Sequence, residues 1–160
     1  MFERVIVSAN RKLVGESVLP ASHHSTSEKI QFMLTPVNPI GQTIPPGMSQ
    51  AMLVKGNLLF LSGHVSVGPA GVVGADVETQ LVQTFENIAG TLKAAGADFS
   101  SIAQLTTYIV NYHTGLLPVF RSVRDRFINL KRPPASTLIG VAALALPGLL
   151  VEIDAIAVVA

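Results

Sequence analysis

Residues 76–110 have the sequence DVETQLVQTFENIAGTLKAAGADFSSIAQLTTYIV, which predicts one helix followed by one strand. Asp76 is a good helix cap, and Gly96 is a typical stop signal. From Ile102 to Val110 the pattern predicts a strand, with Tyr108 on the face opposite Leu105. Within the expected helix, apolar side chains recur every three or four residues, as on one face of an amphipathic helix, at Val77, Leu81, Phe85, Ile88 and Leu92.

The flanking sequence predicts a hairpin upstream and a second helix downstream. The apolar runs Ala51–Val54 and Leu58–Leu61 surround Lys55-Gly56-Asn57, which has the composition of a tight turn. A second helical stripe runs from Leu116 to Leu130, and Pro118 is tolerated there because it falls in the first turn.

Two further strands are expected near the end of the chain. Thr137–Leu146 and Leu149–Val159 are rich in Ala, Val, Ile and Leu, and the Pro147-Gly148 turn separates them. The element order is therefore β-β-α-β-α-β-β. Helices interleaved with such strands predict an α+β fold, a mixed sheet with both helices on one face.

The last expected strand has two unlike faces. Glu152 and Asp154 alternate with apolar residues, so both acids fall on one face. The other face is wholly apolar and is expected to pack against the helices, through Val151, Ile153, Ala155 and Ala157. The acidic face must then meet solvent, another subunit or a cleft between subunits.

Composition favours a single domain that forms an oligomer. Only 13% of the 160 residues are charged, against about 25% in a typical soluble domain, and 49% are hydrophobic. A surface so poor in charge would expose apolar patches in a monomer. The net charge of +1 provides no basic field for nucleic acid. We therefore expect a homo-oligomer and no nucleic-acid partner.

No metal, cofactor or membrane partner is expected. The chain has no cysteine, which excludes disulfides, thiolate metal ligands and a thiol nucleophile. His23 and His24 resemble solvated loop residues more than a metal pair. The charge-free stretch 133–151 is interrupted by prolines, unlike a spanning helix, and the N-terminus lacks a signal-peptide pattern. A cytoplasmic location is the simplest expectation.

Residues 1–46 are expected to form an N-terminal arm, and residues 47–160 the domain itself. Five prolines punctuate the arm, with short strand-like runs at Arg4–Ser8 and Ile30–Leu34. Met33 begins Met-Leu-Thr-Pro, which leaves open whether the arm includes an upstream extension.

Four segments together resemble the YjgF/RidA family of enamine/imine deaminases over residues 47–159. They are NLLFLSGH at 57–64, Asn87 to Gly96 in the expected helix, PAST at 134–137, and VEIDAIA at 151–157. The resemblance implies a fold like that of chorismate mutase, trimers, and clefts at the subunit interfaces. The element order predicted above agrees with that fold.

The resemblance also implies where the site lies. Glu152 matches the glutamate that orients water, and Ser136 stands where the family has the arginine that binds the substrate carboxylate. Met48 stands at a tyrosine position and Phe120 at an asparagine position. The expected ligand-binding residues, from these matches and their neighbours, are Ser136, Thr137, Met48, Ser62, Gly63, His64 and Phe120.

Replacing arginine by Ser136 should weaken binding of ordinary 2-imino acids. Arginine offers a charged, bidentate fork, whereas serine offers one neutral hydroxyl. The loss of a charged hydrogen-bond partner costs about 1.5–3 kcal/mol. Arg132 is either a substitute cation or a solvated loop charge, and Glu152 either works in a cleft or belongs to a structural ion pair. Tyr108 is expected to pack on the strand with its hydroxyl at the surface.

Two classes of function remain open. The first is a deaminase-type enzyme, in which Glu152 activates water against a small enamine or imine without a carboxylate. The second is a non-catalytic protein that binds a metabolite in the same cleft. A ribonuclease is disfavoured because the charge is balanced and no nucleophile-base pair is recognisable.

Overall fold

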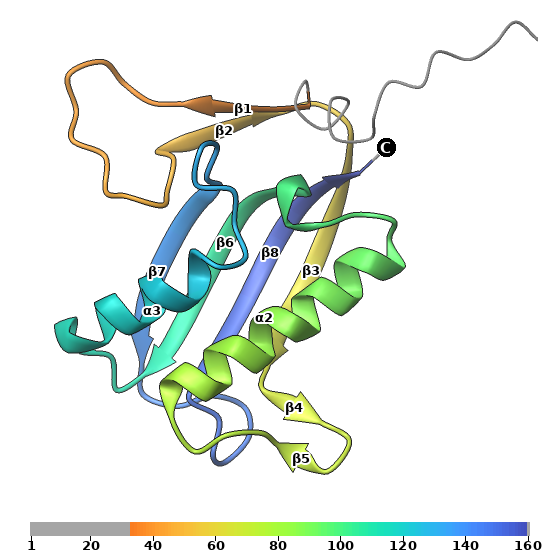
Figure 1. Ribbon diagram of the computed structural model, residues 1–160, viewed down its shortest axis with the longest axis vertical. Coiled ribbons are helices and arrows are strands. Elements are labelled where there is room, and N and C mark those ends of the chain that lie inside the picture. Colours follow the sequence, from red (N-terminus) through yellow and green to blue (C-terminus); the bar gives the residue numbers. More distant parts are fainter. Residues whose placement is uncertain (1–32, 160) are drawn as a thin grey trace, which may run out of the picture.

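The computed structural model describes residues 33–159, and its centre is one four-stranded sheet (Figure 1). The strand order is β3-β8-β6-β7, from Asn57–Val65, Val151–Val159, Ile102–Val110 and Ala135–Val141. Strand β8 runs antiparallel to both β3 and β6, while β7 runs parallel to β6. Helices α2 (Val77–Ala94) and α3 (Leu117–Arg124) cover one face of the sheet. The predicted α+β fold, with a mixed sheet and both helices on one side, is confirmed.

The core lies between the helices and the sheet. The apolar stripe of α2 is buried as the sequence predicts, against the Val151 and Ile153 face of β8. Three phenylalanines join α2 to the segment before β6 and to the turns after α3. The ring centroids of Phe85 and Phe127 are 4.9 Å apart, and Phe99, in the 3-10 helix Phe99–Ser101, lies 5.9 Å from Phe85. This packing fixes the helices on one side and leaves the opposite face uncovered.

Both ends of α2 follow the sequence signals. Asp76 accepts hydrogen bonds from the Thr79 amide at 2.9 Å and from the Thr79 hydroxyl at 2.8 Å. These bonds, chiefly the one from the amide, hold the pKa of Asp76 below its ordinary value. At the other end, Gly96 has φ of +69°, a conformation that favours glycine, and its amide bonds the Lys93 carbonyl.

Replacing Gly90 by alanine is expected to stabilise the protein. Gly90 lies inside α2, is exposed, and has no atom within 4 Å of the place its Cβ would occupy. Alanine loses less backbone entropy in a helix, so Gly90→Ala should raise the free energy of unfolding by about 0.5–1 kcal/mol. Urea denaturation measures this gain. A lower midpoint in the variant would show that position 90 is in contact with something beyond the single chain.

The predicted hairpin between residues 51–54 and 58–61 is wrong. Both segments are strands, but β2 (Ala51–Val54) pairs with β1 (Leu34–Val37), whereas β3 pairs with β8. The turn at Gly56, where φ is +139°, redirects the chain from the small β1–β2 sheet into the main sheet. Figure 1 shows β1 and β2 lying across one end of the main sheet. A local turn signal cannot distinguish this arrangement from a hairpin.

Two further boundaries differ from the prediction. Strand β7 ends at Val141, and β6 separates it from β8, so the Pro147-Gly148 turn lies in the loop 142–150 that crosses to a non-adjacent strand. Helix α3 ends at Arg124 and not at Leu130. After it, the Ile128 amide still bonds the Arg124 carbonyl, in turns that bring Phe127 into the aromatic cluster. The remaining elements are the 3-10 helix Thr114–Leu116 and the short pair β4 (Val67–Gly68) and β5 (Gly71–Val72).

The end of the expected arm contributes to the folded part. Leu34 on β1 is 2% exposed and packs with Ala103 and Val158 in a second, smaller apolar cluster. The run Arg4–Ser8, most of Ile30–Leu34 and the His23-His24 pair lie outside the described residues. The division at residue 46 stays a prediction. Within residues 33–159, no helix is long and apolar enough to cross a membrane.

Candidate functional site

The uncovered face of the sheet carries the acids of β8. Val151 and Ile153 are buried under the helices, while Glu152, Asp154 and Ile156 are half-buried on the other side. The two-faced strand that the sequence predicts is therefore present. Val158 departs from the pattern, because β1 covers that end of the uncovered face.

A hollow of about 280 Å³ surrounds Glu152. Its lining consists of Gly63, Tyr108, Leu144, Glu152 and Asp154. Tyr108 on β6 is the direct cross-strand partner of Glu152, so its phenol and the Glu152 carboxylate project from the same face. Asp154 Oδ1 is buried, and no described residue hydrogen-bonds it. The hollow thus combines two carboxylates and a phenol with an apolar wall.

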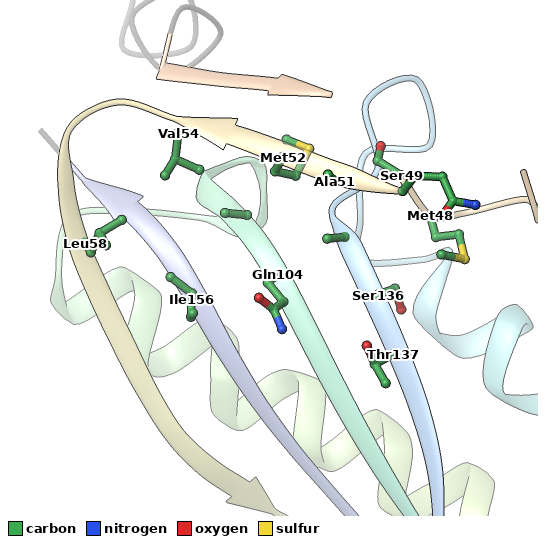
Figure 2. A pocket seen from close by; sticks show the side chains of 13 residues that line it. Met48, Ser49, Ala51, Met52, Val54, Leu58, Gln104, Ser136, Thr137 and Ile156 are labelled. Carbon is green, nitrogen blue, oxygen red and sulfur yellow. The ribbon is translucent and has the colours of Figure 1, made fainter. Parts of the chain in front are cut away.

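A second, larger groove of about 460 Å³ lies under β2 at the end of the sheet (Figure 2). Met48, Ser136 and Thr137 line it together, as expected for ligand-binding residues that share one site. Met52 and Gln104 lie on the two sides of the groove, one on β2 and the other on β6. The sheet side of the groove combines the polar side chains of Gln104, Ser136 and Thr137 with apolar ones such as Leu58 and Ile156.

Ser49 fixes the segment that carries Met48. Its side chain is almost fully buried, and its hydroxyl donates to the Pro133 carbonyl at 2.7 Å. Its amide donates to the Pro134 carbonyl at 2.9 Å. These bonds hold the segment before β2 against the start of β7, so Met48 stands beside Ser136.

Ser136 and Glu152 project from opposite faces of the sheet. Ser136 pairs with Leu105, and Leu138, two residues further on, packs against the core on the helix side. Alternation along β7 therefore turns Ser136 toward that side as well, at the edge of the sheet. Glu152 projects from the uncovered face. Within one chain, these two side chains do not line a common hollow.

His64 and Phe120 line neither hollow. His64 faces α2, where its Nε2 lies 2.7 Å from the Thr91 hydroxyl, and only its neighbour Gly63 borders Glu152. Ser62 is exposed next to the Glu152 hollow without lining it. Phe120 is 3% exposed in the core, where the Arg124 guanidinium lies 5.1 Å from its ring centroid. As placed in this chain, Phe120 is a packing residue.

Neither hollow is lined by a basic side chain. Among residues 33–159, Arg124 and Asp125 form an ion pair at 2.7 Å. Glu152 forms no ion pair with any of these residues. Arg132 is half-buried, lines neither hollow, and has a buried Nη1 for which the described residues offer no partner. The same residues contain no group of three side chains suited to hold a metal ion.

Sequence reasoning misses several residues that line the two hollows. The alternation of its strand places Tyr108 on the correct face, but its register opposite Glu152 depends on which strands pair. Leu144 comes from a loop predicted as strand, and its approach to Glu152 has no local sequence signal. Gln104 and Met52 line the same groove only because β2 lies across the end of the main sheet.

These features define a class of small α+β proteins whose sheet is covered by helices on one side and carries hollows with mixed polar and apolar linings on the other. The family model described as Endoribonuclease L-PSP matches residues 46–159. This chain belongs to that family, the YjgF/RidA family that the sequence motifs indicate.

Individual relatives cover most of the described chain. The putative regulator AldR of Lactococcus lactis is 34% identical over 68% of this chain and 83% of its own. The 2-iminobutanoate/2-iminopropanoate deaminase of Bos taurus is 34% identical over 69% and 78%. The crystal structure of YyfB from Yersinia pestis, a Rid-family protein of unknown function, has a TM-score of 0.70 and 32% identity, over 79% of this chain and 98% of its own.

Proposed function

We propose that this protein is a homotrimer whose inter-subunit clefts handle small reactive metabolites by hydrolytic deamination of an enamine or imine other than ordinary 2-imino acids. One observation carries the proposal: Ser136 and Glu152 lie on opposite faces of the sheet in one chain. A ligand that touches both needs one of them from a neighbouring copy. The named deaminases among the relatives favour the same chemistry.

The uncovered face of the sheet has the composition of a subunit interface. Phe60 on β3 pairs with Ile156 and is 70% exposed, and Leu58 is 47% exposed on the same face. Ile139 on β7 adds a third exposed apolar side chain. Apolar surface of this kind, next to half-buried acids, is typical of contact surfaces. Copies of the chain that cover this face would enclose Glu152 without burying it inside one subunit.

The chemistry follows from the groups around Glu152. As a general base, its carboxylate takes a proton from water while the oxygen attacks the imine carbon. The protonated carboxyl gives this proton to the nitrogen, which yields the carbinolamine, and a second transfer from the new hydroxyl to the amine releases ammonia and a carbonyl compound. One imine and one water thus give one carbonyl and one ammonia. The hollow offers no cation to a substrate carboxylate. This favours substrates without that group, in keeping with serine at position 136.

The alternative function is metabolite binding without turnover. The similarity to the putative regulator AldR supports it, since a regulator can use the same cleft as a sensor. A copurified ligand that is returned unchanged, together with no release of ammonia from any imine, would favour this alternative. In either case we place the protein in the cytoplasm, with a small molecule and further copies of itself as partners.

Light scattering of the purified protein tests the assembly. We expect a mass three times that of the chain, and a stable monomer at micromolar concentration would overturn both the trimer and the cleft. Phe60→Lys should dissociate the oligomer, because it introduces a charge on the uncovered face. Val72→Lys is the matched control, since Val72 is an exposed valine on the β4–β5 hairpin, apart from that face. It should leave the mass unchanged.

A further inference from the structure

Gly63 lies closer to the Glu152 carboxylate than any residue with a side chain could. A Cβ built on Gly63 would stand 1.9 Å from Glu152 Oε1, 2.8 Å from Cδ and 3.1 Å from Cγ. Gly63 is not among the glycines with positive φ, so backbone conformation does not require glycine there. What requires glycine is space: the carboxylate occupies the volume of the missing side chain.

A β-bulge in β3 decides which way Gly63 faces. Leu61 pairs with Ala155, but His64 already pairs with Ile153, so two residues of β3 stand opposite one residue of β8. The extra residue shifts the alternation of side chains along β3. His64 therefore faces the helices, and Gly63 faces the side of the sheet from which the acids project.

His64 ties this bulge to α2. Its Nδ1 lies 2.7 Å from the Ser62 carbonyl oxygen, and its Nε2 lies 2.7 Å from Thr91 Oγ1. A carbonyl oxygen only accepts, so Nδ1 donates to Ser62, while Nε2 and the Thr91 hydroxyl form the second hydrogen bond. One turn earlier on α2, Asn87 donates to the Val65 carbonyl at 2.9 Å. The helix thus holds the bulged backbone from the side opposite Glu152.

We propose that Gly63 is a positioning residue for Glu152, kept at the uncovered face by the bulge that His64 ties to α2. The proposal rests on the proposed function in taking Glu152 as the working carboxylate. A Cβ at position 63 would force Oε1 from 1.9 Å to at least 3.0 Å, a displacement on the order of 1 Å. Oε1 and Cδ, which both lie closer than 3.0 Å, belong to the outer part of the Glu152 side chain, so the side chain can move while the backbone of β8 stays in place.

The test is Gly63→Ala, with Gly90→Ala as the matched control. We expect a crystal structure of Gly63→Ala to show the Glu152 carboxylate displaced. Hydrolysis of benzophenone imine, a stable imine without a carboxylate, should fall about tenfold to a hundredfold, because displacements on this scale lower rates by up to that factor. Gly90→Ala adds the same methyl group in open space and should leave both the carboxylate and the rate unchanged.

A double variant separates positioning from general damage. Glu152→Asp shortens the side chain by one methylene, so it withdraws the Oε1 and Cδ positions that lie nearest the new Cβ and eases the clash. In Gly63→Ala/Glu152→Asp, the loss of melting temperature should be smaller than the sum of the single losses.

A carboxylate that stays in place in Gly63→Ala, or strictly additive losses of melting temperature, would overturn the positioning role. The proposed function fails on a different result, namely unchanged imine hydrolysis in Glu152→Gln, and the crystallographic comparison remains decisive in that case.

Discussion

Glu152→Gln is expected to lower imine hydrolysis or ligand affinity by about a hundredfold or more, the usual scale for a positioned acid or base. Glutamine keeps the shape of the side chain and removes its charge, so the oligomeric state and the melting temperature should remain unchanged. The expectation depends on the position of Glu152 in an open hollow beside Tyr108, without an ion pair among the described residues. Ammonia release and thermal melts on one preparation measure both properties.

Asp154→Asn is the matched control, because Asp154 lies on the same strand face and lines the same hollow. This variant should retain most of the activity if Glu152 alone takes the proton. A different result for Glu152→Gln would identify Glu152 as half of an ion pair across the subunit interface. In that case the variant would destabilise the assembly by about 3–5 kcal/mol and leave ligand handling unchanged. That result would contradict a working role for Glu152.

The second large effect is expected at Ser136. The wild-type protein should hydrolyse ordinary 2-imino acids poorly, and Ser136→Arg should raise that activity by about tenfold to a hundredfold. The gain corresponds to about 1.5–3 kcal/mol for a charged hydrogen bond to the substrate carboxylate. Imino acids generated in situ from amino acids, followed by ammonia release, provide the assay. The groove beside Met48 has room for the longer side chain.

Ser136→Gln separates charge from length. Glutamine is long and polar but neutral, so it should not raise the activity on 2-imino acids. Rapid hydrolysis of these substrates by the wild-type protein would contradict the argument. It would show that another cation reaches the cleft, and Arg132 is the first residue to replace in that case, because the described residues offer its buried Nη1 no partner.

Local signals predict the elements of the fold, and they fail where distant segments pair. Helix α2 follows from its apolar spacing and the Asp76 cap, because both act within a few residues. The Gly56 turn predicts a hairpin, because no local signal indicates that β2 pairs with β1 and not with β3. The loop that contains Leu144 is rich in Ala and Leu, and buried strands have the same composition, so the sequence predicts a strand there.

The candidate site shows the same division. Alternation along β8 is enough to place Glu152 on the uncovered face, because it depends only on neighbouring residues. The burial of Phe120 is also implicit in the sequence, because Phe120 belongs to the apolar stripe that predicts the second helix. The family resemblance alone suggests a cleft role for it. The approach of Gly63 to Glu152 depends on a bulge, and a single inserted residue leaves no readable pattern in the sequence.

The central position of β8 has a consequence for how the protein acquires its activity. Strand β8 bonds β3 on one side and β6 on the other, although α2, β6, α3 and β7 all intervene in sequence between β3 and β8. Until β8 docks, two halves of the sheet have no shared partner, and Glu152 has neither Gly63 nor Tyr108 beside it. Such non-local pairing makes folding slow. Chemical competence should therefore arise in the last kinetic phase of refolding, together with the closing of the sheet.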